Sequence, residues 1–302
     1  MKKFRSGRMK QWPLHVMLLP GVILLFIFCY VPMLGIVIAF QQYNPAKGFI
    51  FNQTFVGLRN FEYIFSLPNI WQVIWNTVYM AVSKIILGMI VPIAVALLLN
   101  ELRSKAYKRC VQTIIYFPYF LSWIILTGVF SDILSPQNGI VNQFLGSFGI
   151  EPIYFLGDKT WFPITMILTD VWKGFGFGTI VYLATITGID PTLYEAAEID
   201  GASRWKQTWH ITLPGMQMII VLMLVLSLGN VLNAGFDQIF NMYNSLVMET
   251  GDILDTMVYR MGLQQSQYGP STAVGLLKSV VSCILISVSY YVSYKAFDYQ
   301  MF

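Results

Sequence analysis

The chain has 302 residues, of which 56% are hydrophobic and 11% are charged. Soluble domains carry about 25% charged residues, so this chain has too few charges to cover a surface in water. The same composition excludes intrinsic disorder and predicts a protein that crosses the membrane several times.

Six stretches are long and apolar enough to form transmembrane helices, because a helix needs about 20 mostly apolar residues to cross the hydrocarbon core. In chain order they are residues 14–40, 72–99, 110–134, 161–187, 217–236 and 271–297. The first stretch is too long for a signal peptide, and no small-residue cleavage site follows it. We therefore expect an all-α polytopic membrane protein with about six transmembrane helices.

The lysines and arginines outside the predicted spans, or at their ends, are distributed unevenly between the two sides of the membrane. One side holds Lys2, Lys3, Arg5, Arg8, Lys10, Arg103, Lys105, Lys108, Arg109, Arg204, Lys206 and Lys295, whereas the other holds Lys47, Arg59, Lys159 and Arg260. Basic residues accumulate on the cytoplasmic side, so both termini are predicted to be cytoplasmic. We interpret residues 1–13 as a cytoplasmic basic tail that sets topology, not as a nucleic-acid-binding patch, and residues 14–302 as a single transmembrane domain.

Three long segments lie on the opposite side, and their mixture of aromatic residues, glycine, asparagine and proline predicts a structured cap. They are residues 41–71, 135–160 and 237–270. The chain has no GxxxxGK[ST] run that could bind ATP phosphates. Its three cysteines and two histidines are far apart, so we expect no metal site and no bound cofactor.

The connection between the fourth and fifth spans, residues 188–215, is too polar to cross the bilayer and rich in helix formers. Asp190 followed by Pro191 predicts a helix start, and this helix should run to about Asp200. Gly201 can end it by adopting a positive φ, and Ser203 can cap a second short helix. Pro214 is expected to limit the far end of that second helix. The segment is therefore predicted to be a helix–glycine–helix on the cytoplasmic face.

Two interpretations of this segment remain open from composition alone. In one, it is an amphipathic hairpin that rests on the lipid headgroups, because Trp205 and Trp209 are four residues apart. In the other, Ala196 and Ala197 keep one surface shallow, so that the backbone of another protein can approach closely.

The amino-acid sequence of the segment resembles the EAA loop of ABC importer permeases. The matching residues have the same spacing, and the segment likewise precedes the last two spans. The matching residues are Glu195, Ala196, Ala197, Asp200, Gly201, Ala202, Ile211, Leu213 and Pro214. Residues 55–61, Asn76-Thr77 and residues 229–237 resemble the carbohydrate-importer branch, which includes the maltose permease. The general likeness is greatest to permeases for complex oligosaccharides of the alginate, pectic or rhamnogalacturonan type.

The resemblance implies a type I ABC importer permease fold, and a chain that is not an enzyme but a subunit of an ATP-driven importer of oligosaccharide. It implies location in a bacterial cytoplasmic (inner) membrane, with a second, related permease chain, two ATPase subunits and an extracytoplasmic sugar-binding protein as partners. ATP and Mg would be used by the ATPase. Residues 188–215 would couple to that ATPase, with Glu195 as a polar or ionic anchor and Gly201 as the bend or the point of close approach.

Polar and aromatic residues within the spans are candidates for the substrate path, because charged groups in a membrane usually face a cavity or a partner. They are Lys84, Lys173, Tyr116, Tyr119, Trp172, Asn230, Asn233 and Asp237. The lysines suggest the hypothesis that the substrate is an acidic oligosaccharide. Alternatively, Lys173 pairs with Asp170 on its own helix, and the aromatic residues are interface belts.

Two other functions compete with this interpretation. A membrane-embedded enzyme would need a nucleophile–base pair or a metal set, which two distant histidines do not provide. An ion-coupled carrier would tend to show inverted repeats, and the sequence has no internal repeat.

Overall fold

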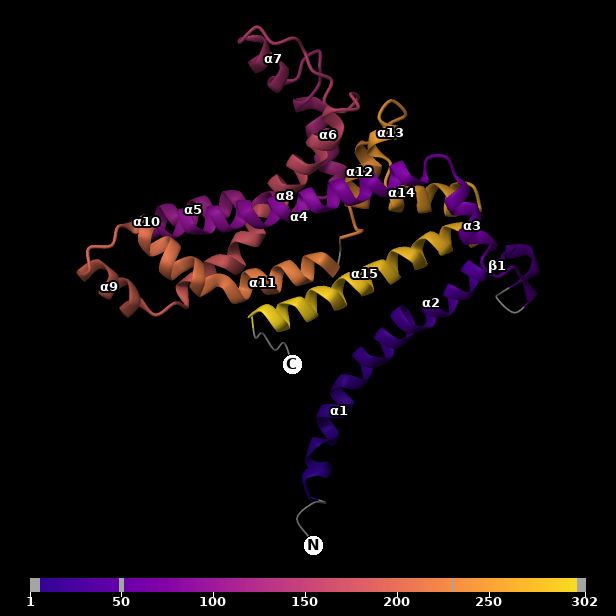
Figure 1. The fold of residues 1–302 in the computed structure, drawn as a ribbon, viewed down its shortest axis with the longest axis horizontal. Coiled ribbons are helices and arrows are strands. Elements are labelled where there is room, and N and C mark those ends of the chain that lie inside the picture. The colour runs from indigo at the N-terminus through magenta and orange to yellow at the C-terminus, as the bar shows by residue number, and fades with distance from the viewer. Residues whose placement is uncertain (1–5, 49–51, 230, 298–302) are drawn as a thin grey trace. The chain divides into compact units, whose positions relative to one another are not determined.

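The computed structural model describes residues 6–48, 52–229 and 231–297 (Figure 1). In chain order, the first elements are α1 Ser6–Leu25, η1 Phe26–Tyr30, α2 Val31–Met33, η2 Leu34–Phe40, β1 Gln41–Gln42, η3 Pro45–Lys47, β2 Thr54–Phe55, α3 Arg59–Ser66 and α4 Ile70–Asn100. Then follow α5 Lys105–Tyr116, η5 Phe117–Phe120, α6 Trp123–Ile133, α7 Ile140–Gly146, α8 Trp161–Thr187, α9 Pro191–Ile199, α10 Arg204–Gln207, η6 Thr208–Thr212 and α11 Leu213–Gly229. The last are α12 Phe236–Met242, α13 Met248–Gly251, α14 Leu254–Tyr259, η7 Arg260–Gln264 and α15 Tyr268–Phe297. The fold class is all-α, as predicted.

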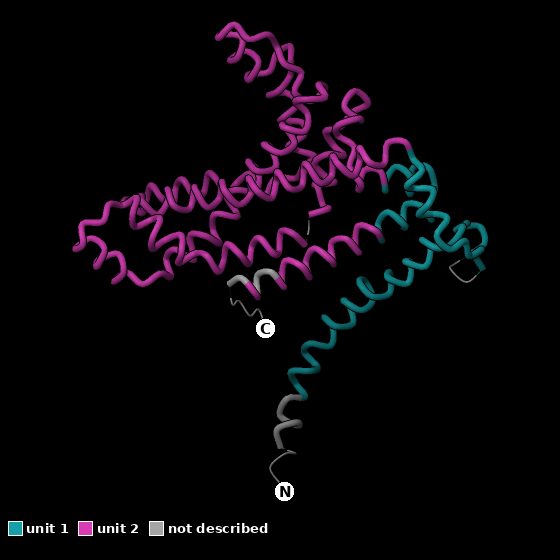
Figure 2. The backbone as a smooth tube through the Cα atoms, in the orientation of Figure 1, with its two compact units in different colours: residues 1–67, 258–276 teal, residues 68–257, 277–302 magenta. Residues whose placement is uncertain are grey.

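The chain forms two compact units, shown in different colours in Figure 2. Unit 1 comprises residues 1–67 and 258–276, and unit 2 comprises residues 68–257 and 277–302. The long helix α15 contributes its first residues to unit 1 and the rest to unit 2.

Five helices among the described residues are long and apolar enough to cross a membrane, and a bent helix pair can supply a sixth crossing. The five are Trp12–Phe40, Ile70–Asn100, Trp161–Thr187, Arg204–Gly229 and Tyr268–Tyr291. They match five of the six predicted spans, although the fifth predicted span differs at both ends.

The third predicted span, residues 110–134, is not one straight helix. Its two halves, Lys105–Phe120 and Trp123–Ile133, meet at an angle of 105°. Pro118 lies just before the bend, Leu121 is extended, and the side chain of Ser122 caps the second half by accepting a hydrogen bond from the Ile125 N–H at 3.3 Å. A proline followed by a new N-cap ends one helix and starts another. The prediction of a single helix used only hydropathy and therefore missed this break.

The fifth span begins earlier than predicted, because Pro214 does not end the preceding helix. Helices α10, η6 and α11 form one continuous helix from Arg204 to Gly229. A π-helical turn at Thr208–Thr212 ends two positions before Pro214. Such a turn shifts the hydrogen-bond register, so the missing N–H of the proline is accommodated without a stop. The helix then ends at Gly229, not at residue 236, and α12 begins after an irregular segment.

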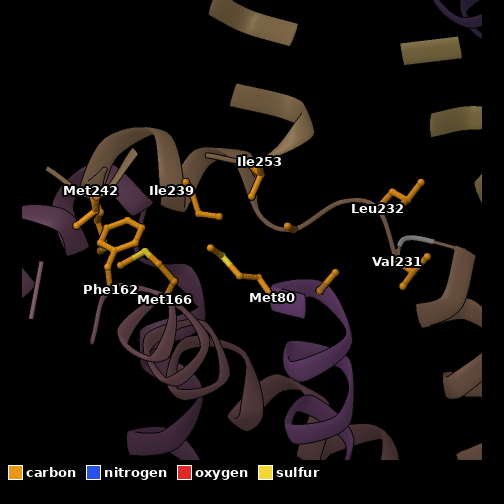
Figure 3. Close-up of a cluster of buried hydrophobic side chains, with 11 residues drawn as sticks. Met80, Phe162, Met166, Val231, Leu232, Ile239, Met242 and Ile253 are labelled. Atoms are coloured by element: carbon orange, nitrogen blue, oxygen red, sulfur yellow. The ribbon is translucent and has the colours of Figure 1, made fainter. Parts of the chain in front are cut away.

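The core of unit 2 forms where α4 and α8 pack along each other and α12 closes over them. Figure 3 shows Met80 of α4, Phe162 and Met166 of α8, Ile239 of α12 and Ile253 in one buried cluster. Together these side chains fix the ends of the predicted spans to the segments that connect them.

The three segments predicted to be structured do contain regular elements. Residues 41–71 contain the antiparallel pair β1–β2, in which Gln41 faces Phe55, and helix α3. Residues 135–160 contain α7, and residues 237–270 contain α12, α13 and α14. Within unit 2, α12 and α13 lie far from α9, which is at the opposite end of the unit in Figure 1.

Candidate functional site

The helix α9 begins and ends through local hydrogen bonds, as its sequence predicted. The carboxylate of Asp190 accepts a hydrogen bond from the Thr192 N–H at 3.0 Å, and this interaction holds the pKa of Asp190 below its ordinary value. At the other end, Gly201 has φ +71°, and the Ala202 N–H donates to the Ala197 carbonyl oxygen at 2.8 Å. This six-to-one bond with a left-handed glycine is a Schellman motif, which stops the helix sharply.

The second half of the segment is anchored to its surroundings in unit 2. Ser203 caps α10, and the Arg204 guanidinium lies 3.5 Å from Glu198 of α9 and 3.8 Å from Glu101 at the end of α4. The hydroxyls of Tyr194 and Thr212 lie 3.0 Å apart and link α9 to the π-helical turn. These contacts link α9 to the helix that continues into α11.

The predicted coupling residues are all brought together in this segment. Five of them are exposed, namely Glu195, Ala196, Asp200, Gly201 and Pro214. The other four are partly buried, namely Ala197, Ala202, Ile211 and Leu213. Large apolar side chains are also exposed here: Leu193, Ile199, Trp205 and Trp209 are 51%, 87%, 70% and 54% accessible. An exposed apolar surface with charged neighbours is typical of a protein or membrane contact.

A second cluster surrounds Lys84 in the middle of α4. Its ammonium donates to the Ala234 carbonyl oxygen at 2.7 Å and to Oε1 of Gln238 at 2.5 Å, and it lies 3.6 Å from Asp170. The side chain of Lys84 is only 8% exposed. A buried cation needs such partners, because an unpaired charge inside a membrane is costly.

The same cluster holds the irregular segment that follows the fifth span. The amide of Gln238 donates to the Met166 carbonyl oxygen and to the Thr169 hydroxyl, each at 2.8 Å. Gly235 has φ +93°, and a β-carbon there would lie 2.9 Å from Nζ of Lys84. Glycine therefore permits both the backbone conformation and the close approach of the lysine.

A cavity of about 410 Å³ opens beside this cluster and is lined by Lys84, Gly88, Asp170, Ser227, Asn233 and Gly235. Asp170 is 35% exposed, so its carboxylate is accessible from the cavity. Sequence reasoning placed Lys84 and Asn233 in one path but did not place Ser227 there, because no local pattern singles out a serine in an apolar helix.

The other candidates on α8 lie in different environments. The ammonium of Lys173 donates to the Tyr119 carbonyl oxygen at 2.8 Å and lies over the rings of Tyr119 and Trp123. It does not pair with Asp170, which faces Lys84 instead. The ring of Trp172 packs edge-on against Phe130 at 5.5 Å between centroids.

The remaining candidates are dispersed. Tyr116 is partly buried at the end of α5, and Asp237 is exposed on α12, where its carbonyl oxygen accepts a hydrogen bond from Asn241. Asn230 lies outside the described residues. Asn76 donates to the carbonyl oxygens of Glu249 and Asp252 and so ties α4 to the segment around α13, which is a structural role.

Residues 84–299 match the family described as binding-protein-dependent transport system inner membrane component. The chain belongs to this family. It is a multi-pass membrane permease subunit of an ABC transporter and has no catalytic role itself. No group of three or more potential metal ligands occurs among the described residues.

Two curated proteins of Bacillus subtilis (strain 168) are similar to this permease over almost its whole length. It is 42% identical over 288 residues to the polygalacturonan/rhamnogalacturonan transport system permease protein YteP, covering 95% of this chain and 89% of that protein. It is 42% identical over 290 residues to Protein LplB, covering 96% and 90%.

The fold of the permease is similar to that of a chain in a solved transporter. The crystal structure is that of a bacterial alginate ABC transporter in complex with an alginate pentasaccharide-bound periplasmic protein. The TM-score is 0.89 and the identity is 37%, with 98% of each chain covered.

Proposed function

We propose that this permease forms half of the membrane path of an importer for acidic oligosaccharides, built from uronic acids. Polygalacturonan and alginate, which the names of the similar proteins specify, are both polymers of uronic acids. A second, related permease completes the path, an extracytoplasmic binding protein delivers the sugar, and two ATPase subunits use ATP and Mg. Both termini lie in the cytoplasm, and the protein resides in the cytoplasmic membrane.

The exposed helix–glycine–helix segment is the single observation that carries the coupling mechanism. Helix α9 enters a groove of the ATPase, with Glu195 as its polar anchor and Ala196 and Ala197 permitting close approach. Because α10 runs without a stop into α11, a displacement of this segment is transmitted directly to the fifth span. Apolar residues at the ends of α9 and α10 supply the contact area.

Closure of the ATPase dimer on ATP then pulls the segment and rotates the attached spans, which switches the cavity between inward-facing and outward-facing states. This is a rigid-body transition that requires different binding to the two states. Changing the ratio of the two states from 1:99 to 99:1 needs a difference in binding free energy of about 5.5 kcal/mol. A capped, rigid helix can transmit the ATPase movement that supplies this difference to the spans, whereas a loose loop would absorb the movement.

The cavity beside Lys84 lies on the substrate path in this proposal. Asp170 and Asn233 are suited to sugar hydroxyls, because a carboxylate accepts hydrogen bonds from them and an amide both accepts and donates. Lys84 lines this cavity. The candidates Lys173, Tyr116, Tyr119, Trp172 and Asp237 would act at other points of the route, and Asn230, which lies outside the described residues, stays a prediction from the sequence.

The decisive experiment measures ATP hydrolysis by the complete complex in lipid nanodiscs, with the binding protein loaded with oligogalacturonate or with a neutral oligosaccharide. Acidic oligosaccharide should stimulate hydrolysis, and Glu195→Ala should abolish the stimulation while leaving assembly of the membrane chains intact. Glu62→Ala, which removes an exposed carboxylate from α3, is the matched control. Undiminished stimulation in the Glu195 variant would contradict the anchor, and stimulation by neutral sugars alone would contradict the substrate class.

A further inference from the structure

Unit 1 contains a second cavity, of about 360 Å³, to which none of the functions proposed above assigns a role. Its lining includes Tyr43, Arg59, Tyr63, Gln267 and Tyr268. The volume falls within the range of about 300–1,000 Å³ that is typical of small-molecule sites. None of its lining residues belongs to the cavity beside Lys84.

The walls of this cavity are held in place by buried contacts. The amide of Asn60 donates to the carbonyl oxygens of Ala39 and Gln41 at 2.8 and 3.0 Å. A β-carbon at Gly269 would lie 2.8 Å from both the Asn60 amide nitrogen and the Gln41 carbonyl oxygen, so only glycine fits at that crossing. The end of the first span, α3 and the start of α15 are thereby locked together within unit 1.

The cavity also presents unused polar groups. Arg59 is exposed and makes no ion pair with any residue that the structure describes. The Oε1 atom of Gln267 is buried and accepts no hydrogen bond from described residues. Ser266 has φ +57°, a rare conformation for serine that turns the chain sharply just before Gln267.

The aromatic groups complete a surface suited to sugars. The rings of Tyr43 and Tyr268 meet edge to face at 5.6 Å between centroids, and the ring of Tyr63 is 41% exposed. Pyranose rings pack their C–H groups on such rings, amides bind hydroxyls, and a guanidinium binds a carboxylate through two parallel hydrogen bonds. A uronic acid has all three matching groups.

We propose that this cavity is an outer-face binding site for a uronate unit of the oligosaccharide, with Arg59 as the carboxylate-binding residue. In the proposed orientation, the end of the first span and the start of the last span both lie on the side to which the binding protein delivers the sugar. Arg59 thus selects acidic sugars before they reach the membrane. The inference rests on the proposed substrate class.

The test measures binding of trigalacturonate and of neutral maltotriose to the nanodisc complex without binding protein, by isothermal titration calorimetry. Arg59→Gln should weaken trigalacturonate binding by about ten-fold or more and leave maltotriose binding unchanged, because only the acidic probe uses a charge-assisted bond. Tyr63→Leu should weaken both probes. Lys47→Gln, which removes an exposed basic residue outside the cavity in the same unit, is the matched control and should change neither.

Three results would each overturn the proposal. They are a wild-type complex that binds no trigalacturonate, an Arg59→Gln variant that binds it unchanged, and a loss of binding that is equal in Arg59→Gln and Lys47→Gln. The ATPase assay with loaded binding protein, run on the same preparations, separates this outcome from failure of the proposed function. Stimulated hydrolysis without a specific Arg59 effect would leave the importer proposal intact and remove only this site.

Discussion

Lys84 of α4 and Gln238 of α12 are joined by a 2.5 Å hydrogen bond, although 154 positions separate them in the chain. The same ammonium binds the carbonyl oxygen of Ala234 in the irregular segment before α12. This lysine therefore ties the break after the fifth span to the second span. The sequence suggested that Lys84 contacts the substrate. In the structure, its ammonium instead donates most of its hydrogen bonds to groups of the protein itself.

Replacement of Lys84 by methionine is expected to destabilise the protein, because the acceptors at Ala234 and Gln238 would be left buried without a donor. The cost should be about 1–3 kcal/mol for such groups. Loss of the ion pair with Asp170 should add a smaller cost to the free energy of unfolding, because Asp170 is partly exposed and solvent screens its charge. A lower midpoint of thermal unfolding, with uptake of acidic and neutral oligosaccharides reduced alike, is the expected result. Lys105→Met, at an exposed position of α5, should change neither quantity. Loss restricted to acidic sugars at full stability would show direct substrate contact instead.

Gly201 is expected to tolerate asparagine but not valine. At φ +71° a β-carbon costs about 1–2 kcal/mol for most residues, whereas asparagine adopts this conformation more readily. Beyond the adjacent residues, no atom of the described part of the chain lies within 4 Å of the position that a β-carbon would take, so within this chain the effect comes from the backbone and not from a clash. Gly201→Val should reduce binding-protein-stimulated ATP hydrolysis, and Gly201→Asn should preserve most of it. Equal activity of the two variants would contradict the role of the left-handed bend.

Gly176 is expected to accept no side chain, because a β-carbon there would lie 1.9 Å from the carbonyl oxygen of Ile115. Separation of α5 from α8 should cost about 1–3 kcal/mol or more, as for other overpacked sites. Gly176→Ala should therefore lower the yield of folded protein and its thermal unfolding midpoint. Gly174→Ala, two residues earlier on the same helix, is the control, because a β-carbon there meets no atom of another described segment within 4 Å. Identical behaviour of the two variants would show that the helices can separate without loss.

The N-cap of α9 is expected to weaken only in acid. The backbone N–H of Thr192 lowers the pKa of Asp190 from its ordinary value of 3.8, so the folded state favours the charged form. The capping contribution is thus present in full above this value and is lost as the pH falls through the lowered pKa of the folded state. The protection factors of the amides in the first turn of α9, which are corrected for the intrinsic exchange rate at each pH, should be constant near pH 7 and fall below about pH 4. Asp190→Asn should remove this pH dependence of the protection factors while keeping the cap, whereas Asp190→Ala should show low protection factors at every pH.

The sequence by itself determined the membrane class, five of the span positions and both ends of α9. Hydropathy over about 20 residues depends only on local composition, and the caps at Asp190 and Gly201 are made by neighbours in the chain. Local rules also predicted helix ends that the structure does not have. Pro214 was expected to stop a helix, but the π-helical turn before it lets the helix continue into α11.

Only the tertiary structure decided the partner of Asp170 and the membership of the two cavities. Asp170 lies three residues from Lys173 on one helix, yet its carboxylate faces Lys84 of another helix, because α4 and α8 pack along each other. Likewise, Arg59 and Gln267 are brought to one cavity by contacts at Asn60 and Gly269. Such pairings follow from the packing of segments that are distant in the chain, and no periodicity within one segment encodes them.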